Sequence, residues 1–257
     1  MDKSSFGGVL LAMGGILAGM MMEGGRIGQI LQPTAALIVF GGTLGAIMLQ
    51  FPLSTVLAAA KSVVHVFFSK EPDGHAVVTQ LVGFANKARR SGLLSLDQDL
   101  ASVSDPFLKQ ALMLAVDGTE PAELRKIMQL DLDNHGEIEE RIPQVFESAG
   151  GFSPTVGIIG AILGLIQVMQ HLDNINEVGR GIAVAFVATI YGVGLANLVL
   201  LPCAGKLKLR HREEQSQKEL MIEGVISILE GMNPRMVELK LRTFLSKQET
   251  EMESAKA

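Results

Sequence analysis

The segment 181–205 reads GIAVAFVATIYGVGLANLVLLPCAG and contains no Asp, Glu, Lys or Arg. A helix needs about 20 mostly apolar residues to cross the hydrocarbon core of a bilayer, so this segment is long enough for one crossing. Three more uncharged segments occur at 4–22, 27–60 and 148–172, and Pro33 and Pro52 bracket a suitable span in the longest of them. The sequence therefore predicts transmembrane helices at four places, which are 5–23, 33–51, 153–172 and 182–203.

The composition of the whole chain agrees with a membrane protein. Of 257 residues, 48% are hydrophobic and only 19% are charged, and the mean hydropathy is +0.33. A soluble domain usually carries about 25% charged residues. The single cysteine, Cys203, excludes a disulfide framework. The net charge of -5 argues against a nucleic-acid binder.

Basic residues directly after the fourth predicted span indicate its orientation. They are Lys206, Lys208, Arg210 and Arg212. The connections 23–32 and 173–181 each hold only one basic residue. Because loops rich in Lys and Arg stay in the cytoplasm, we expect both termini in the cytoplasm and both short connections outside. The predicted organisation is a transmembrane hairpin, a helical cytoplasmic domain, a second transmembrane hairpin and a cytoplasmic helical tail, at 1–51, 52–150, 151–205 and 206–257.

Helix-start and helix-stop signals indicate that the cytoplasmic segments are helical. Asp105-Pro106 predicts an N-cap followed by proline at the first helical position. Asp117-Gly118 ends that helix, Glu120-Pro121 starts another, and the stretch 137–152 is expected to run on towards the third span. A charged helix at 206–230 and a last short helix opening at Pro234 are predicted in the tail. The fold class expected is therefore an all-α integral membrane protein.

The predicted spans carry glycines four residues apart and no charged side chain near mid-membrane, since Glu23 lies at the outer end of the first span. The pairs are Gly15 and Gly19, Gly41 and Gly45, and Gly160 and Gly164. Small residues at this spacing let helices approach closely in lipid, which favours a tightly packed or oligomeric bundle. An ion pathway needs a titratable or coordinating group near mid-membrane. Because these spans hold no carboxylate near mid-membrane, another chain must supply the acid if ions pass.

Other site chemistries find no support in the residues. The histidines do not fall at metal-ligand spacing, and no glycine-rich loop ends in Lys-Ser or Lys-Thr as a phosphate-binding loop would. We therefore expect no enzyme activity, metal site or cofactor. The segment 87–99 holds basic residues before a glycine turn and acids after it. Such charges form either a solvated face or an electrostatic docking surface.

Several runs of the sequence resemble the MotA family of flagellar stator subunits, within the MotA/TolQ/ExbB proton channel family. They are Ala88–Asp97 (ARRSGLLSLD), Ala115–Gly118 (AVDG), Gly150–Gly157 (GGFSPTVG), Ala185–Thr189 (AFVAT) and Met221–Gly224 (MIEG). The resemblance covers nearly the whole chain. The longer run 182–192 is most similar to the MotC branch. TolQ and ExbB proteins have a single span before the cytoplasmic domain, and the extra hairpin here distinguishes the chain from them.

The resemblance implies a function and a set of partners. Members of the family form a pentameric ring in the bacterial inner membrane, around the transmembrane helices of a MotB dimer. That partner carries the membrane aspartate, and the ring drives a rotor switch-complex protein. The ion-path positions implied by the family are Pro154, Thr155, Thr189 and Pro202. The rotor-docking positions implied are Arg89, Arg90 and Asp97, where the family usually has Glu in place of Asp97.

The transported ion and two alternative functions stay open at the level of sequence. Position 188 is Ala, so Thr189 has no second hydroxyl directly beside it. Sodium needs several oxygen ligands, which favours protons here. One alternative is a TolQ- or ExbB-like energiser of another envelope process. The other is a membrane scaffold that conducts no ions.

Overall fold

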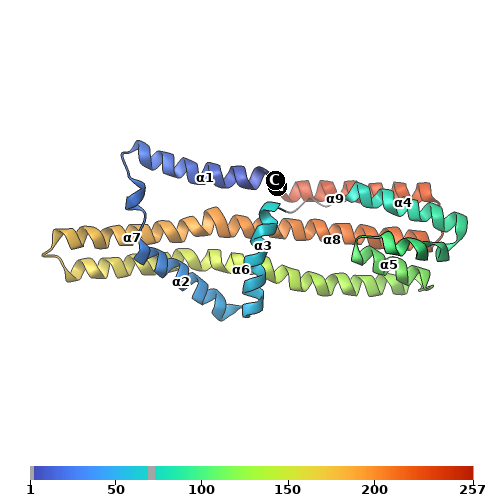
Figure 1. The fold of residues 1–257 in the computed structure, drawn as a ribbon, viewed down its shortest axis with the longest axis horizontal. Coiled ribbons are helices and arrows are strands. Elements are labelled where there is room, and N and C mark those ends of the chain that lie inside the picture. Colours follow the sequence, from blue (N-terminus) through green and yellow to red (C-terminus); the bar gives the residue numbers. More distant parts are fainter. Residues whose placement is uncertain (1–2, 69–72, 257) are drawn as a thin grey trace. The chain divides into compact units, whose positions relative to one another are not determined.

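A computed structural model describes residues 3–68 and 73–256 of the chain (Figure 1). Every regular element in these ranges is helical, which confirms the predicted all-α class. The α-helices are α1 (Lys3–Met22), α2 (Pro33–Gln50), α3 (Leu53–Phe68), α4 (Gly74–Ser91), α5 (Pro106–Val116), α6 (Pro121–Gln170), α7 (Ile175–Leu195), α8 (Leu201–Leu229) and α9 (Pro234–Lys256). A 3-10 segment, Leu93–Ser102, lies between α4 and α5, and a π-helical turn, Ala196–Leu200, joins α7 to α8.

Three helices in the described part of the chain are long and apolar enough to cross a membrane. They are α2, α6 and the continuous helix Ile175–Leu229, which combines α7, the π-helical turn and α8. The apolar part of α1, Phe6–Met22, is slightly shorter. Apolar helices therefore occur at all four predicted positions, while the number of crossings stays a prediction.

The chain divides into two compact units. Unit 1 comprises Met1–Lys70 and Glu139–Leu209, and unit 2 comprises Glu71–Ile138 and Arg210–Ala257. The stretch 137–152 does run on into the third span, and α6 joins it to the helix that starts at Pro121, as one helix of 50 residues. The last helix was expected to be short, but α9 has 23 residues.

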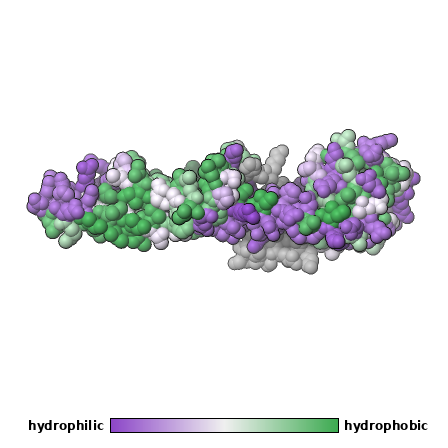
Figure 2. Space-filling model, turned by 90° about the horizontal axis from the view of Figure 1, so that it is seen from below, coloured by the Kyte–Doolittle hydropathy of each residue, from purple (hydrophilic) through white to green (hydrophobic). Residues whose placement is uncertain are grey.

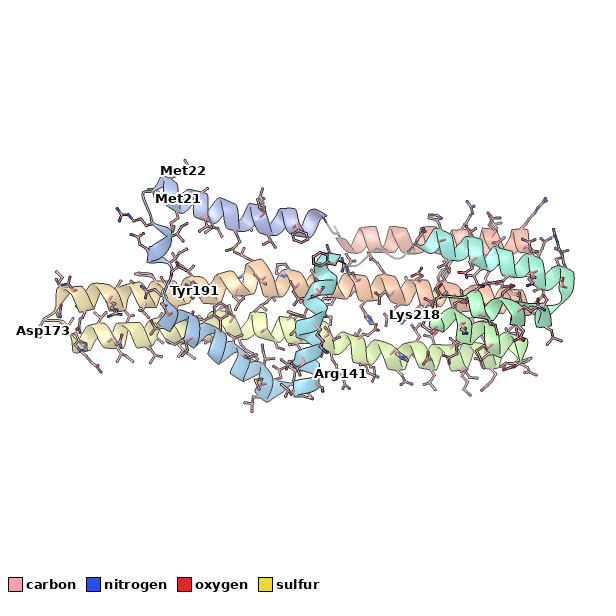
Figure 3. The ribbon with its side chains drawn as sticks, in the orientation of Figure 1. Met21, Met22, Arg141, Asp173, Tyr191 and Lys218 are labelled. Carbon is pink, nitrogen blue, oxygen red and sulfur yellow. The ribbon has the colours of Figure 1, made fainter. Side chains whose placement is uncertain are left out.

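Unit 1 has an apolar exterior. Large side chains such as Leu37, Leu49 and Phe186 are 78%, 91% and 69% exposed. Figure 2 shows mainly hydrophobic surface along the hairpin of α6 and α7, with hydrophilic residues at its tip, where Asp173 lies in Figure 3. Soluble proteins rarely expose large contiguous apolar patches. This surface is suited to lipid.

Unit 2 has a conventional buried core to which five helices contribute. Each of these helices contributes at least one fully buried leucine, such as Leu81 of α4, Leu108 of α5, Leu124 of α6, Leu220 of α8 and Leu241 of α9. The predicted N-cap of α5 is confirmed, since the Asp105 carboxylate accepts a hydrogen bond of 3.0 Å from the Leu108 N–H. The helix ends at Val116, and Gly118 takes a φ of +80°, which suits glycine.

A charged network ties three helices of unit 2 together. The Glu223 carboxylate on α8 lies 2.6 Å from an Arg125 nitrogen on α6 and 2.9 Å from Lys240 Nζ on α9. Burial by itself raises the pKa of Glu223, but the hydrogen bonds and charges of Arg125 and Lys240 outweigh it, so this pKa lies below its ordinary value. The ionised carboxylate therefore stabilises the folded unit.

We expect Glu223→Gln to lower the stability of the full chain at neutral pH by about 1–2 kcal/mol. The pKa of Glu223 is lower in the folded state than in the unfolded state. The ionised carboxylate therefore adds to the free energy of unfolding at pH values above its ordinary pKa of 4.5, and this stabilisation is lost as the pH falls below that value. The measurement is thermal unfolding followed by circular dichroism at neutral and acidic pH. The exposed Glu214→Gln on the same helix is the control. An equal loss of stability in both variants would contradict the stabilising role of the Glu223 network.

Candidate functional site

Small residues form a seam where α6 and α7 face each other, side by side in Figure 1. On α6 they are Ser153, Gly157, Gly160 and Gly164, and on α7 they are Gly181, Ala185, Ala188 and Gly192. Both sets repeat at intervals of four, three and four residues, which keeps each set on one helix face. The sequence therefore matches two small-residue faces along the predicted third and fourth spans.

The seam leaves no room for a larger side chain at its glycines. A Cβ added to Gly192 would lie 2.6 Å from the Ser153 carbonyl oxygen, and one added to Gly157 would lie 2.9 Å from the Ala188 carbonyl oxygen. The buried Ser153 hydroxyl donates a 3.0 Å hydrogen bond to the Gly192 carbonyl. The two helices thus meet backbone to backbone, the kind of contact that associates helices in lipid.

The predicted glycine pairs differ in what they contact within the chain. A Cβ added to Gly160 would meet the Ala188 side chain at 2.8 Å, and one at Gly164 would meet the Gly181 carbonyl at 2.8 Å. A Cβ added to any glycine of the pairs in the first two spans would meet nothing within 4 Å. These are Gly15 with Gly19 and Gly41 with Gly45. For those two pairs, contact with another chain stays a prediction.

Thr155 and Thr189 both use their hydroxyl protons within their own helices. Thr155 donates to the Phe152 carbonyl at 2.7 Å, and Thr189 donates to the Ala185 carbonyl at 3.1 Å. What each hydroxyl offers to an incoming group is therefore its lone pairs. Thr189 also lies beside the seam, because its Cα is 3.5 Å from a Cβ added to Gly157.

The two prolines of the predicted ion path lie in different local structures. Pro154 is inside α6 and supplies no N–H to the helix. A span at 182–203 and a charged helix at 206–230 were predicted separately, but the helix continues through Pro202 and joins them. The continuation follows the π-helical turn, in which the Leu201 N–H donates to the Ala196 carbonyl five residues earlier. Such turns accommodate an irregularity without breaking the helix.

The predicted docking charges are exposed on unit 2. Arg89 and Arg90 lie in the last turn of α4, which Gly92 ends with a φ of +81°. The following 3-10 segment directs Leu96 and Leu100 into the core and leaves Asp97 exposed. Two neighbouring charges pair with each other, since Lys87 Nζ lies 2.8 Å from the Asp99 carboxylate. Arg89, Arg90 and Asp97 thus present both signs of charge at the surface.

The single tyrosine, Tyr191 of α7, has a role that the sequence did not predict. The Tyr191 hydroxyl donates to the Ile30 carbonyl at 2.5 Å and accepts a longer bond of 3.4 Å from the Gln32 N–H. It therefore holds the connection before α2 against α7 (Figure 3). The only available signal was that the chain has one tyrosine and that it lies inside an apolar segment.

The site has few groups for metal or acid–base chemistry. Among the described residues, no three His, Cys, Asp or Glu side chains gather as metal ligands would. The one carboxylate within the predicted spans is Glu23, the last residue of the first span, so none lies near mid-membrane. What the α6–α7 wall offers chemically is hydroxyl and carbonyl oxygen on a rigid, apolar support.

Two family models match the chain. Residues 99–220 match the model described as the MotA/TolQ/ExbB proton channel family, and residues 6–92 match the model described as Motility protein A N-terminal. Motility protein A of Bacillus subtilis is 35% identical over 247 residues, which cover 95% of this chain and 91% of that protein.

Two solved structures share the fold. The structure titled C. jejuni MotAB has a TM-score of 0.90 and 32% identity, and the match covers 95% of this chain and 96% of that one. The flagellar MotAB stator complex from Bacillus subtilis has a TM-score of 0.87 and 34% identity, and the match covers 97% of this chain and 99% of that one.

Proposed function

Because the chain belongs to the MotA/TolQ/ExbB proton channel family, we propose that it is the ring-forming subunit of a flagellar motor stator that turns proton flow into torque. The observation that carries this is the match to MotAB stator structures over nearly the whole chain. The named relatives are motility proteins, which favours a stator over an energiser of another process or a scaffold. Closeness to the MotC branch stays a prediction.

The proposed assembly is a pentamer around a MotB-like dimer in the bacterial inner membrane. Each subunit crosses the membrane four times with both termini in the cytoplasm. The partner supplies the membrane aspartate, because the predicted spans of this chain hold no carboxylate near mid-membrane. The subunit acts as channel wall and lever and catalyses no covalent reaction.

In the proposed mechanism, a proton neutralises the partner's aspartate and changes its contacts with the wall of α6 and α7. The lone pairs of Thr155 and Thr189 accept hydrogen bonds from water or from the protonated acid. Pro154 and Pro202 shape the helices beside the path. The rigid seam makes each hairpin move as one body, so a local change in contact advances the ring by a step.

The energy available for each proton is adequate for a stepping motor. One elementary charge that crosses 100 mV releases about 2.3 kcal/mol. Arg89, Arg90 and Asp97 then transmit the step to the rotor through complementary charges, which set orientation and partner choice.

Deletion tests the proposed function directly. In a strain where this chain and its partner form the sole stator, we expect deletion to abolish swimming while flagella still assemble. Expression of the chain together with the partner should restore swimming, and the chain without the partner should not. Unchanged swimming after deletion would overturn the proposal. Flagellar staining and a proton-leak assay of the complex separate a lost motor from lost flagella.

We expect swimming speed to be unchanged when potassium replaces sodium at fixed pH and fixed membrane potential. The reason is that Thr189 has no adjacent hydroxyl, and a proton needs only the acid and a water path, whereas sodium needs several oxygen ligands. Collapse of the speed without sodium, with recovery when sodium returns, would identify sodium as the ion instead. A sodium-driven stator in the same assay is the control.

A further inference from the structure

An apolar groove of 540 Å³ lies in unit 1 between α1, α3, α6 and the start of α8. Its walls include Ala12 of α1, Val63 of α3 and Phe146 of α6, and the π-helical turn contributes Val199. Among the lining residues that the structure describes, Lys206 is the only charged one. None of these residues belongs to the seam of α6 and α7.

The groove joins two segments that the predicted topology places at the inner membrane face. The α1 lining comes from residues 8–12, near the start of the first predicted span. The other main wall comes from residues 197–203, at the end of the fourth predicted span, and Lys206 follows directly. The structure brings these distant segments together on one groove. Its position therefore corresponds to the inner leaflet, with a lysine at headgroup level.

The size of the groove favours a thin occupant over a helix of another chain. A helix is about 10 Å across and rises 5.4 Å per turn, so 540 Å³ holds little more than one turn of it. An extended hydrocarbon chain is far thinner and is the surrounding solvent in a bilayer. Rim residues such as Val9 are partly exposed, at 41%, so the groove opens towards that solvent.

The lysine at one end selects the headgroup. An ammonium group near the cytoplasmic surface attracts anionic lipid, while its methylene stem stays along apolar surface. We propose that the groove binds an acyl chain of one anionic phospholipid from the inner leaflet, with the lipid phosphate at Lys206. The bound acyl chain fills the space beside the π-helical turn and supports α1, whose main contacts within unit 1 are with α3 and that turn. This inference does not depend on the partner or the ion.

Fluorescence quenching tests the proposal, because the chain contains no tryptophan. A single Val9→Trp reports on the groove, and Leu11→Trp on the same helix is the control, since Leu11 is 79% exposed and does not line the groove. The full chain is reconstituted in phosphatidylcholine vesicles that contain equal fractions of brominated phosphatidylglycerol or brominated phosphatidylcholine. We expect the ratio of quenching by brominated phosphatidylglycerol to quenching by brominated phosphatidylcholine to be about fivefold higher for Val9→Trp than for Leu11→Trp. This is the factor expected for one lysine near anionic lipid. Lys206→Gln should remove that preference.

Two results would overturn the proposal. One is a groove tryptophan that prefers phosphatidylglycerol no more than the Leu11→Trp control does. The other is a groove tryptophan that neither brominated lipid quenches, which would mean that protein from a second copy fills the groove. Native mass spectrometry of the unmodified chain gives an independent measurement. Retention of phosphatidylglycerol by the wild type and its loss in Lys206→Gln is expected, and equal retention would contradict the role of Lys206.

Discussion

Gly192→Ala is expected to abolish swimming, because the seam between α6 and α7 has no space for one methyl group. The added Cβ would lie 2.6 Å from the Ser153 carbonyl oxygen and 3.1 Å from the Gly157 Cα. Both are backbone atoms, so no side-chain rotation relieves the contact. The helices must separate, which also stretches the hydrogen bond from the Ser153 hydroxyl to the Gly192 carbonyl. Overpacking of this kind costs about 1–3 kcal/mol.

The functional loss should exceed the loss of stability. In lipid, helices associate through close packing and hydrogen bonds, so separation of the seam removes what makes the hairpin one rigid body. Thr189 lies three residues before Gly192 and would move with the helix. We therefore expect chains that are inserted and present at reduced level, but that produce no torque even when overexpressed.

The matched control is Gly194→Ala on the same helix. A Cβ at Gly194 would meet nothing within 4 Å in this chain. Swimming speed, membrane level by immunoblot and thermal stability in detergent are measured for both variants. Near-normal swimming by Gly192→Ala, or equal loss in both variants, would show that the seam does not control function. Gly157→Ala should behave as Gly192→Ala does, because it faces the Ala188 carbonyl at 2.9 Å.

The sequence predicted the helices better than it predicted their contacts. Charge-free segments and caps such as Asp105-Pro106 are local signals, and they located α2, α5 and the apolar part of α6. The continuity of the helix through Pro202 was not predicted, because the change from apolar to charged residues near 205 suggested a span followed by a separate helix. The π-helical turn that accommodates it depends on the surrounding packing.

The seam shows why contacts are hard to predict from one chain. Gly160 and Gly164 were recognised as a pair, but their partners Gly181, Ala185 and Ala188 look like ordinary small residues until α7 is placed against α6. Glycine spacing alone also selected Gly41 and Gly45, whereas Gly42 is the residue that faces Val156. The roles of Thr155 and Thr189 stay predictions, because they concern the partner's side of the path.

The second large effect is expected at the exposed charges of unit 2. Arg89→Glu and Asp97→Lys, separately and together, should strongly reduce torque while the stator still assembles. Each site is exposed, so the cost in stability should stay below about 0.5 kcal/mol. Charge reversal should harm more than Arg89→Ala or Asp97→Ala, because like charges repel across a docking surface.

Torque of tethered cells separates docking from general charge effects. Lys126→Glu is the control, since it makes the same charge change at an exposed position of α6 in unit 2, outside the 87–99 segment. Proton leak through complexes that lack torque should remain, because the reversed charges act on the rotor and not on the ion path. Normal torque in the double reversal variant would exclude Arg89 and Asp97 from rotor contact. Loss of both torque and proton leak would instead indicate that the substitutions at Arg89 and Asp97 impair assembly of the stator.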